Sequence, residues 1–312
     1  MIEVKNLGKR YGDKIAVDDL SFTVRPGIVT GFLGPNGAGK STTMRMIVGL
    51  DAPTSGTVTV NGRRYTDHAA PLHEIGTLLE AKAVHTGRSA YHHLRALAAT
   101  TGISRRRVDE VIELVGLREV ARKRAGGFSL GMGQRLGIAS ALLGDPQTIL
   151  LDEPVNGLDP EGVRWIRNLL KDLAAEGRTV FISSHLMSEM ALTAEHLVVV
   201  GRGKLIADVP MAKFCGLAST SGVRVRSPHA HQLGELLAGP EVTISSAERG
   251  VLEISGLSTE QIGERAAAAG LTLHELSVQH ASLEEAFMEL THDAVEYSAT
   301  TSPQPVLAGK AA

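Results

Sequence analysis

Three glycines and a lysine are spaced as in a phosphate-binding loop, where a predicted strand leads into a predicted helix. Residues 28–33 form an apolar run typical of a buried strand, and residues 41–49 have a helical pattern. Glycines let backbone N–H groups converge on phosphate oxygens, and the Lys40 ammonium reaches the terminal phosphates. Ser41 is placed to bind Mg²⁺. The predicted phosphate-binding residues are Gly34, Pro35, Asn36, Gly37, Ala38, Gly39, Lys40, Ser41 and Thr42.

Two acidic residues follow a second apolar run. Residues 147–151 are expected to form a buried strand that ends in Asp152 and Glu153, at the carboxyl edge where ligands gather in α/β sheets. We expect Asp152 to hold Mg²⁺ through water. Glu153 points the other way and is placed to polarise an attacking water as general base. For residues 34–42, the alternative is a glycine-rich turn that only reverses the chain. For Asp152 and Glu153, the alternative is an ordinary turn at a strand end.

The segment Phe-Ser-Leu-Gly-Met at residues 128–132 opens an apolar helical run. Ser129 can cap the helix, and Gly131 lets its backbone approach closely, so this helix N-terminus can receive an anion. With the acidic pair following about twenty residues later, the segment resembles the signature of the ATP-binding cassette (ABC) ATPases, usually written LSGGQ. In that family the signature caps the γ-phosphate bound by the opposite subunit. The departures from the family pattern are Phe128, Leu130 and Met132.

The resemblance covers about the first 215 residues and implies an α/β fold, a P-loop ABC ATPase core with a helical subdomain at about 85–145. It implies that ATP and Mg²⁺ bind, and that Lys40, Glu153 and His185 are the catalytic residues, with His185 as the switch that contacts the γ-phosphate. Asp159 lies in the family's D-loop and, like Ser129 and Gly131, serves the site in trans. Tyr11 is similar to the aromatic residue on which adenine stacks, in a segment expected between two short strands.

Glu80 departs from the family pattern. After the strand-like run 75–79, ABC ATPases normally have a glutamine that touches Mg²⁺ and the attacking water. A carboxylate still coordinates Mg²⁺ but adds negative charge beside the phosphates and Glu153. Some exporters resembling the bacitracin type have an acidic residue there, and loss of activity is the alternative. Residues 81–88 are similar to the surface offered to the coupling helix of a membrane subunit, or form a plain surface loop.

Composition limits the function. The 312 residues carry a formal charge of −2, so nucleic acid is not an expected partner, and the basic runs 105–107 and 122–124 are interpreted as solvated helix faces. One cysteine, Cys215, excludes an intrachain disulfide framework. No signal peptide and no apolar run of ~18–20 residues is visible, so we expect a cytoplasmic protein, peripheral on the inner face of the cell membrane.

The pattern changes after about residue 215. Strands are expected at 223–226, 242–244, 251–254 and 271–278, and helices at 228–237 and 258–269, which is the βαββαβ order of a ferredoxin-like α+β domain at 216–291. A last helix at 282–290 offers Leu283, Phe287 and Leu290 for docking on its own domain or on a dimer mate. Residues 292–312 are expected to be disordered. No metal site is expected among the histidines His229, His231, His274 and His280.

These features predict the ATP-hydrolysing subunit of an ABC-2-type exporter resembling the bacitracin and daunorubicin types. Two copies would form a homodimer through their ABC domains and power efflux, of an antibiotic or drug, through a separate integral-membrane permease. A soluble non-transport ABC ATPase, either a translation or repair factor or a drug-sequestering resistance protein, is the alternative. A P-loop kinase or GTPase is a third possibility, but it does not explain residues 128–132.

Overall fold

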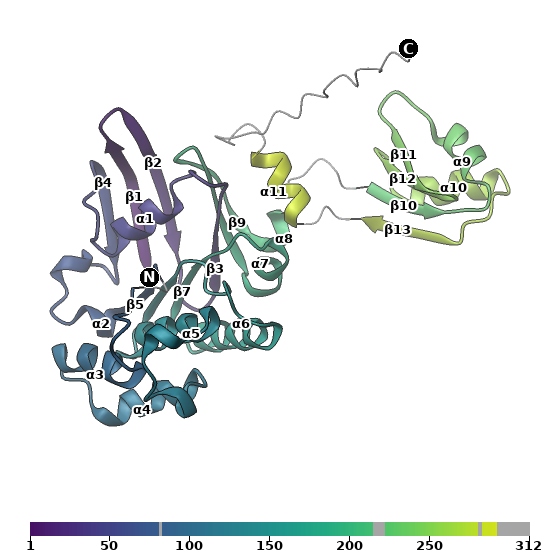
Figure 1. The fold of residues 1–312 in the computed structure, drawn as a ribbon. Coiled ribbons are helices and arrows are strands. Elements are labelled where there is room, and N and C mark those ends of the chain that lie inside the picture. The colour runs from purple at the N-terminus through teal and green to yellow at the C-terminus, as the bar shows by residue number, and fades with distance from the viewer. Residues whose placement is uncertain (81–82, 215–221, 280–282, 292–312) are drawn as a thin grey trace, which may run out of the picture.

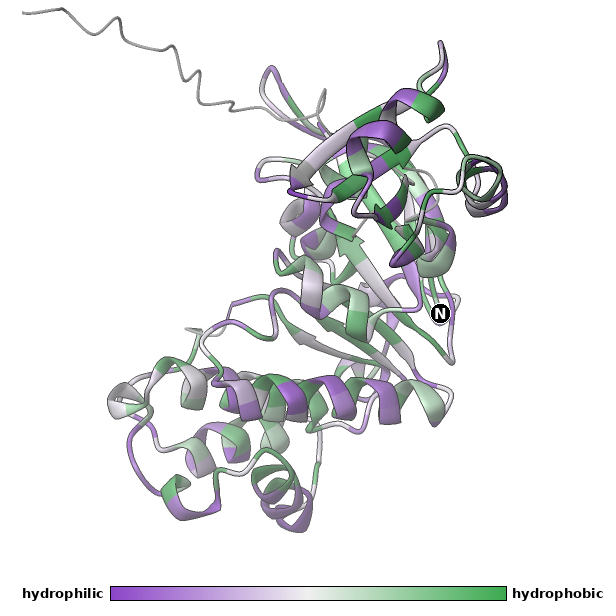
Figure 2. Ribbon diagram, turned by 90° about the vertical axis from the view of Figure 1, so that its right-hand side faces the viewer, coloured by the Kyte–Doolittle hydropathy of each residue, from purple (hydrophilic) through white to green (hydrophobic). Residues whose placement is uncertain are grey.

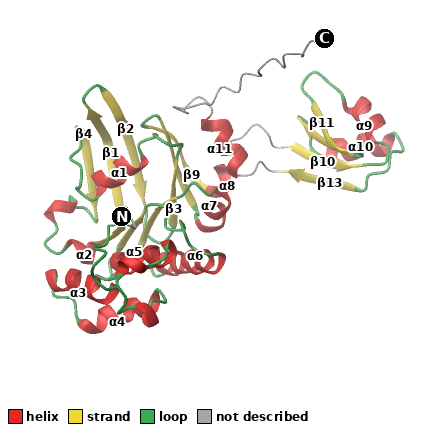
Figure 3. Ribbon diagram, in the orientation of Figure 1, coloured by secondary structure: helices red, strands yellow, loops and turns green. Residues whose placement is uncertain are grey.

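The computed structural model describes residues 1–80, 83–214, 222–279 and 283–291 of the chain. Three β-sheets organise these residues (Figures 1 and 3). Two sheets and the helices packed on them form the larger, N-terminal part, and the third sheet belongs to residues 222–279. The predicted α/β class is confirmed, with a smaller α+β unit after it.

An antiparallel sheet of three strands begins the chain, in the order β2-β1-β4. Its members are β1 (Ile2–Tyr11), β2 (Lys14–Val24) and β4 (Ser55–Val60). The prediction of two short strands flanking residues 9–12 is wrong. The ladder continues to the pair Tyr11–Lys14, because Gly12 adopts a positive φ of 58° and closes a tight turn.

A mixed sheet of six strands lies at the centre, in the order β5-β6-β7-β3-β8-β9. Its members are β3 (Val29–Leu33), β5 (Ile75–Leu78), β6 (Thr148–Leu151), β7 (Thr179–Ser183), β8 (His196–Gly201) and β9 (Lys204–Pro210). The first five strands of this order run parallel, and β9 is antiparallel to β8. Because the parallel strands end at one edge, the loops after β3, β6 and β7 lie together there.

Three phenylalanines join the two sheets. Phe22 from β2 lies 5.7 Å, between ring centroids, from both Phe32 of β3 and Phe181 of β7. Phe32 and Phe181 are 5.1 Å apart. These tilted contacts bury large apolar side chains between the sheets. The antiparallel sheet is thereby fixed against β3 and β7, whose ends carry predicted site residues.

Helices lie on both sides of the central sheet. The longer ones are α1 (Lys40–Ile47), α3 (Ala90–Thr100), α4 (Arg105–Leu114), α5 (Leu130–Leu142), α6 (Pro160–Ala175) and α7 (Met187–Thr193). The short ones are η1 (Tyr65–Asp67), α2 (Pro71–Glu74), η2 (Arg118–Val120), η3 (Ala125–Gly127) and α8 (Met211–Phe214). Buried residues of α1 pack between the two sheets, and those of α3 to α7 pack on the opposite face.

Serine or aspartate begins several of these helices. The side chains of Ser89, Ser104, Ser129 and Asp159 accept the backbone N–H three residues later and so cap α3, α4, α5 and α6. In Figure 2 the helices carry both hydrophobic and hydrophilic residues, as expected for helices with one face on a core. Within the described part of the chain, no helix has the length and apolar character required to cross a membrane.

The C-terminal unit has the predicted ferredoxin-like topology. It runs β10 (Gly222–Arg226), α9 (Ala230–Leu237), β11 (Thr243–Glu248), β12 (Val251–Ser255), α10 (Thr259–Ala268) and β13 (Glu275–Gln279). The sheet order is β11-β12-β10-β13, all antiparallel. The predicted capping box is confirmed: Ser258 and Gln261 bond each other's backbone N–H groups at the start of α10.

Two C-terminal elements differ from the prediction. The last strand begins at Glu275, because Leu271 and Leu273 pack on the core of this unit from an irregular segment before it. The final helix, α11 (Leu283–Thr291), buries Leu283 and Phe287 in the core of the N-terminal part. His280 and residues 292–312, on which expectations were also placed, lie outside the described residues.

The interpretation of the basic runs as solvated helix faces is wrong in two respects. Residues 122–124 lie in a turn between η2 and η3, and Arg122 stacks 4.8 Å from the centroid of the Tyr91 ring. Arg107, in the first turn of α4, donates hydrogen bonds to Leu142 O at 2.9 Å and Leu143 O at 3.3 Å. It therefore adds a donor to two carbonyl groups at the end of α5, where Leu142 O also accepts the N–H of Asp145 at 3.1 Å.

We predict that Arg107→Ala lowers the free energy of unfolding by about 1–2 kcal/mol, because a charged donor to two carbonyl groups is lost. Arg106→Ala is the matched control: it removes only an exposed i,i+4 pair with Glu110, which contributes about 0.5 kcal/mol or less. Urea unfolding followed by the fluorescence of Trp165, the single tryptophan, measures both. Equal effects would show that the carbonyl contacts of Arg107 contribute nothing.

Candidate functional site

The loop between β3 and α1 wraps around the side chain of Lys40. Gly37 and Gly39 have φ values of 82° and 95°, in the left-handed region that favours glycine. Lys40 Nζ donates hydrogen bonds to Gly34 O at 2.5 Å and Pro35 O at 3.2 Å. The ammonium group is therefore held over the loop, close to backbone N–H groups at the start of α1. This arrangement suits an anion.

A cavity of about 330 Å³ opens against this loop. It is lined by Tyr11, Lys14, Ala16, Asn36, Gly37, Ala38, Gly39, Lys40, Ser41 and Thr42. A Cβ at Gly39 would lie 2.5 Å from Ala16 O, so the cavity wall at this point has room only for backbone. The wall presents N–H, ammonium and hydroxyl groups, and these fit the phosphates of a nucleotide.

The carboxylate of Asp152 lies at the end of β6 and contacts two hydroxyl groups. Its Oδ2 accepts a hydrogen bond from Ser41 Oγ at 3.1 Å, and its Oδ1 accepts one from Ser183 Oγ. Its backbone N–H donates to Leu78 O at 2.7 Å, across to β5. Hydroxyl and carboxylate oxygens are ligands that Mg²⁺ prefers, so the oxygens of Ser41 and Asp152 fit this ion.

Glu153 has a strained backbone and a fixed carboxylate. Its φ of 52° is unusual for a residue with a side chain, and two contacts hold it: its N–H donates to Ser183 Oγ at 3.0 Å, and its carbonyl accepts from Gln134 Nε2 at 3.0 Å. Its Oε2 lies 2.7 Å from His185 Nδ1 and 3.3 Å from the His185 backbone N. The structure thus brings together the two residues predicted as general base and switch.

Lys40 joins the loop and the acidic pair electrostatically. Burial lowers the pKa of the Lys40 ammonium, and the carboxylates of Glu153 and Asp152 oppose this shift. The cation is therefore close enough to both carboxylates to be influenced by their charge. Lys40, Ser41, Asp152, Glu153 and His185 form one continuous cluster at the carboxyl edge of the central sheet.

The signature segment lies elsewhere on the same chain. Ser129 Oγ accepts the N–H of Met132 at 3.2 Å and so caps α5. It lines a separate cavity of about 530 Å³ with its neighbours Phe128 and Leu130 and with Val84 and Thr86. The cavity against the phosphate-binding loop contains none of these residues. Within the chain, the two motifs therefore line different cavities.

The predicted D-loop packs directly on the signature. A Cβ at Gly131 would lie 2.7 Å from Gly157 O, so the loop carbonyl approaches the helix backbone closely. Asp159 accepts the N–H of Gly162 at 2.9 Å and caps α6. The D-loop that contains Asp159 thus packs beside Ser129 and Gly131 at the start of α5. A change in the position of the D-loop must act on the start of α5.

Tyr11 ends β1 beside the phosphate-binding loop, with its ring about half exposed. Its Oη donates to Asp51 Oδ2 at 3.0 Å, and Arg45 Nε pairs with the same oxygen at 2.8 Å. Lys9 Nζ lies 4.9 Å from the ring centroid. Desolvation and the hydrogen bond to Asp51 raise the pKa of Tyr11, so the ring stays neutral. Its orientation is therefore fixed by residues outside the predicted motif.

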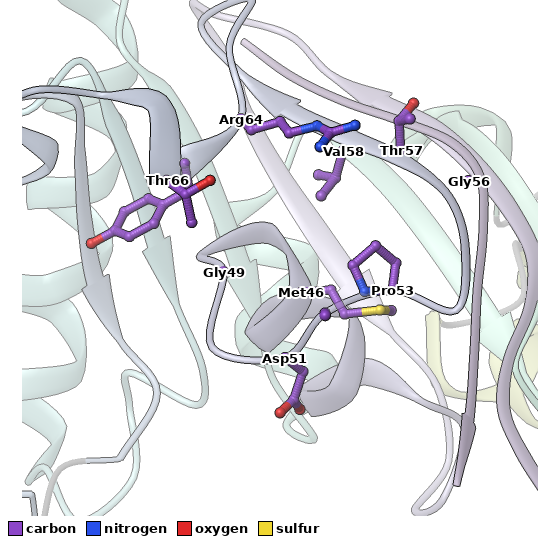
Figure 4. Close-up of a pocket in the computed structure, with 11 residues that line it drawn as sticks. Met46, Gly49, Asp51, Pro53, Gly56, Thr57, Val58, Arg64 and Thr66 are labelled. Atoms are coloured by element: carbon purple, nitrogen blue, oxygen red, sulfur yellow. The ribbon is translucent and has the colours of Figure 1, made fainter.

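Asp51 also borders a second cavity, of about 430 Å³, between the loop after α1, β4 and η1. Figure 4 shows Met46 and Pro53 between the carboxylate of Asp51 and the guanidinium of Arg64. Residues 34–42 do not line this cavity. Asp51 thus both accepts the hydrogen bond of Tyr11 and lines a second cavity that is separate from the phosphate-binding loop.

Glu80 follows β5 and is exposed. The hydrogen bond and charge of Asp51 raise the pKa of Arg45, and the charge of Glu80 adds a smaller contribution in the same direction. The backbone carbonyl of Glu80 accepts the N–H of Ala83 at 3.2 Å. Residues 81 and 82 lie outside the described residues, so the predicted permease-facing segment is described only from residue 83 onward.

Sequence reasoning missed three supporting residues: Gln134, Ser183 and Asp51. Ser183 precedes the predicted switch histidine by two positions and Gln134 follows the signature, so both lie beside residues that were identified. Their partners are 30, 31 and 19 positions away along the chain, in other elements. Asp51 gave no signal, because its contact with Tyr11 spans 40 positions.

Comparison with known proteins places the chain in a family. The family described as ABC transporter matches residues 17–156, and one described as a domain of unknown function matches residues 221–284. The uncharacterized ABC transporter ATP-binding protein YhcH of Bacillus subtilis is 37% identical over 300 residues, covering 95% of this chain and 97% of that protein. The bacitracin transport ATP-binding protein BcrA of Bacillus licheniformis is 43% identical over 213 residues, covering 67% and 70%.

A solved structure agrees with the sequence relatives. The dimeric ATP-binding cassette in a post-hydrolysis state, bound to ADP and Pi, superimposes with a TM-score of 0.62 and 25% identity. The match covers 68% of this chain and 99% of that one. The phosphate-binding loop, the acidic pair and these similarities lead to the same assignment: the chain belongs to the ABC transporter ATP-binding proteins, and its N-terminal part is an ATP-hydrolysing cassette.

Proposed function

We propose that this protein is the ATP-hydrolysing subunit of an ABC-2-type exporter and powers the efflux of an antibiotic or drug through a separate membrane permease. The observation that carries the ATPase chemistry is the contact of Glu153 with His185, next to the Ser41–Asp152 pair. Support for export comes from the relative named for bacitracin transport. In this role the protein is cytoplasmic and peripheral on the inner face of the membrane.

Different residues of the site bind the phosphates, the adenine and the Mg²⁺ of the nucleotide. Lys40 and the N–H groups of the loop bind the phosphates, and Tyr11 stacks on adenine. Ser41, Asp152 and Glu80 hold Mg²⁺, which neutralises phosphate charge when it is bound. Residues 34–42 orient the terminal phosphate toward the edge where Asp152 and Glu153 lie, so the reacting groups are positioned before the chemistry begins.

Glu153 takes the proton of the attacking water. Its Oε2 already contacts His185, so a water bonded to the other carboxylate oxygen would meet a base whose orientation is fixed. His185 holds that orientation and contacts the γ-phosphate. The contacts of Ser183 and Gln134 keep the Glu153 backbone in its left-handed conformation. The site therefore depends on residues that never touch ATP.

Two copies complete the site as a homodimer. Ser129 lines a different cavity from Lys40 within one chain, and Gly131 and the D-loop of Asp159 pack beside it; support for the dimer comes from the dimeric cassette of similar fold. Each signature helix N-terminus would then face the γ-phosphate held by the other copy. ATP binding closes the dimer and moves the permease, and hydrolysis resets it.

A soluble, non-transport ABC ATPase is the alternative. It would hydrolyse ATP with the same residues but would not respond to a membrane partner. Residues 83 and 85–88, which follow Glu80 closely in the sequence, are exposed, and this favours a protein whose catalytic edge contacts another chain. Co-purification with a membrane subunit encoded beside the gene distinguishes the two functions.

Glu153→Gln should lower kcat for ATP by roughly 10²–10⁴, the usual contribution of a general base, while the affinity for ATP persists. It should also trap an ATP-bound dimer that light scattering detects. Glu161→Gln, an exposed change on α6, is the control and should hydrolyse ATP at the wild-type rate. If Glu153→Gln also turns over at that rate, Glu153 is not the base.

Ser129→Arg should leave ATP binding nearly intact but abolish hydrolysis, because a bulky side chain would fill the space for the partner's phosphate. Lys40→Ala should lose ATP binding. When the two variants are mixed, each heterodimer retains one of its two composite sites, so activity should return. Full activity of Ser129→Arg alone would show that each chain contains a self-sufficient site.

Glu80→Ala should leave ATP binding measurable but end the stimulation of hydrolysis by the co-purified membrane partner, since we propose that the Glu80 carboxylate couples the Mg²⁺ site to residues 83–88. Glu80→Gln, the commoner family residue, removes one negative charge and should keep or raise basal hydrolysis. Stimulated ATPase activity and uptake into inverted membrane vesicles measure both. Fully coupled transport by Glu80→Ala would make Glu80 a passive surface residue.

A further inference from the structure

The helix α11 follows the C-terminal sheet in the sequence but packs in the core of the N-terminal part. Its buried residues Leu283, Ala286 and Phe287 are 5%, 0% and 7% exposed, and they share one helical face at i, i+3 and i+4. They belong to the same buried cluster as Met190 of α7 and Phe214 of α8. In the sequence, residues 222–279 therefore lie between two helices, α8 and α11, that both pack in the core of the N-terminal part.

Among the described elements, α11 contacts α7, the helix that begins two residues after His185. Figure 1 shows α11 beside α7 and α8. Leu186, between His185 and the helix, donates its N–H to Ser184 Oγ at 3.0 Å and accepts the N–H of Met190 at 3.0 Å. His185 is thus continuous with the first turn of α7. Any tilt or shift of α7 moves its backbone relative to Glu153.

This helix cannot hold its own position. It has seven residues, too few for a helix to be stable without packing, and its N-cap Leu186 makes no side-chain capping bond. Its order must come from its neighbours. Met190 packs against β3, where a Cβ at Gly31 would lie 2.4 Å from its sulfur, and Glu189 pairs with Arg167 of α6 at 2.7 Å. The third neighbour is α11.

We propose that α11 is a brace that sets the position of α7, and that Phe287 is a positioning residue for His185. The inference rests on the proposed role of His185 in hydrolysis. With α11 docked, α7 is held by β3, α6 and α11, and His185 stays in contact with Glu153. When α11 leaves, α7 loses its contact with α11 and the His185 segment loosens. The C-terminal unit therefore acts on turnover through the helix that follows it.

The test uses the full chain with Phe287→Ala. Because Phe287 does not line the cavity against the phosphate-binding loop, the KM for ATP should stay within about twofold, whereas kcat should fall roughly ten- to hundredfold through misplacement of His185. Phe287→Leu should restore most of kcat by refilling the same space. Met288→Ala is the matched control, since Met288 is on the same helix and 60% exposed, and it should behave as wild type.

Hydrogen exchange gives a readout independent of turnover. Amides of α7 should exchange faster in Phe287→Ala, while those of β3 and α1 keep their wild-type protection. If Phe287→Ala does not fold, as judged by Trp165 fluorescence, Leu283→Ala removes less packing and should give the same pattern at smaller amplitude. Wild-type kcat in a folded variant with faster exchange in α7 would overturn the proposal. Unchanged exchange in α7 would overturn it as well.

His185→Ala separates this proposal from the proposed function. If His185→Ala loses turnover and Phe287→Ala does not, the brace is wrong and the catalytic assignment stands. If His185→Ala hydrolyses ATP at the wild-type rate, the assignment of His185 itself fails.

Discussion

The hydrogen bonds to Asp152 are the interaction on which the rest of the site depends. Ser41 on α1 and Ser183 on β7 both donate to this carboxylate, so one side chain ties the helix after the phosphate-binding loop to two strands. Ser183 also accepts the N–H of Glu153, so the pairing of β6 with β7 determines where both acidic residues point. A shift of one residue in that pairing would turn Ser183 to the opposite face. The phenylalanine contacts between the sheets fix β3 and β7 in place.

The separation of the two cavities explains why the proposed mechanism needs two copies of the chain. Each chain presents a phosphate-binding surface and, elsewhere, a helix start suited to cap a phosphate. The two motifs line different cavities within the chain, so in the proposed mechanism hydrolysis would wait for a second copy. The D-loop packs on the signature through Gly131 and Gly157, so a shift of one segment would act on the other.

The sequence predicted the parts of the site that are local. The glycine spacing identified residues 34–42, and an apolar run ending in two carboxylates identified Asp152 and Glu153, because strand, loop and first helical turn are contiguous there. The contacts that hold Glu153 and Tyr11 were not predicted. Gln134 and Asp51 reach their partners only after the sheets have packed, and no local pattern encodes such pairs. The last helix and its apolar face were predicted. The surface on which this helix docks could be identified only from the structure, since several surfaces could bury Phe287 equally well.

The place of α11 in the chain has a consequence for biosynthesis. A ribosome completes the phosphate-binding loop, the acidic pair and His185 well before it reaches residues 283–291, and the whole C-terminal sheet is made in between. During that interval α7 lacks its contact with α11. If α11 braces His185 as proposed, a truncated chain that lacks α11 would contain every catalytic residue and bind ATP, but it would hydrolyse ATP slowly. ATP hydrolysis by incomplete copies that lack the C-terminal unit would thereby be limited.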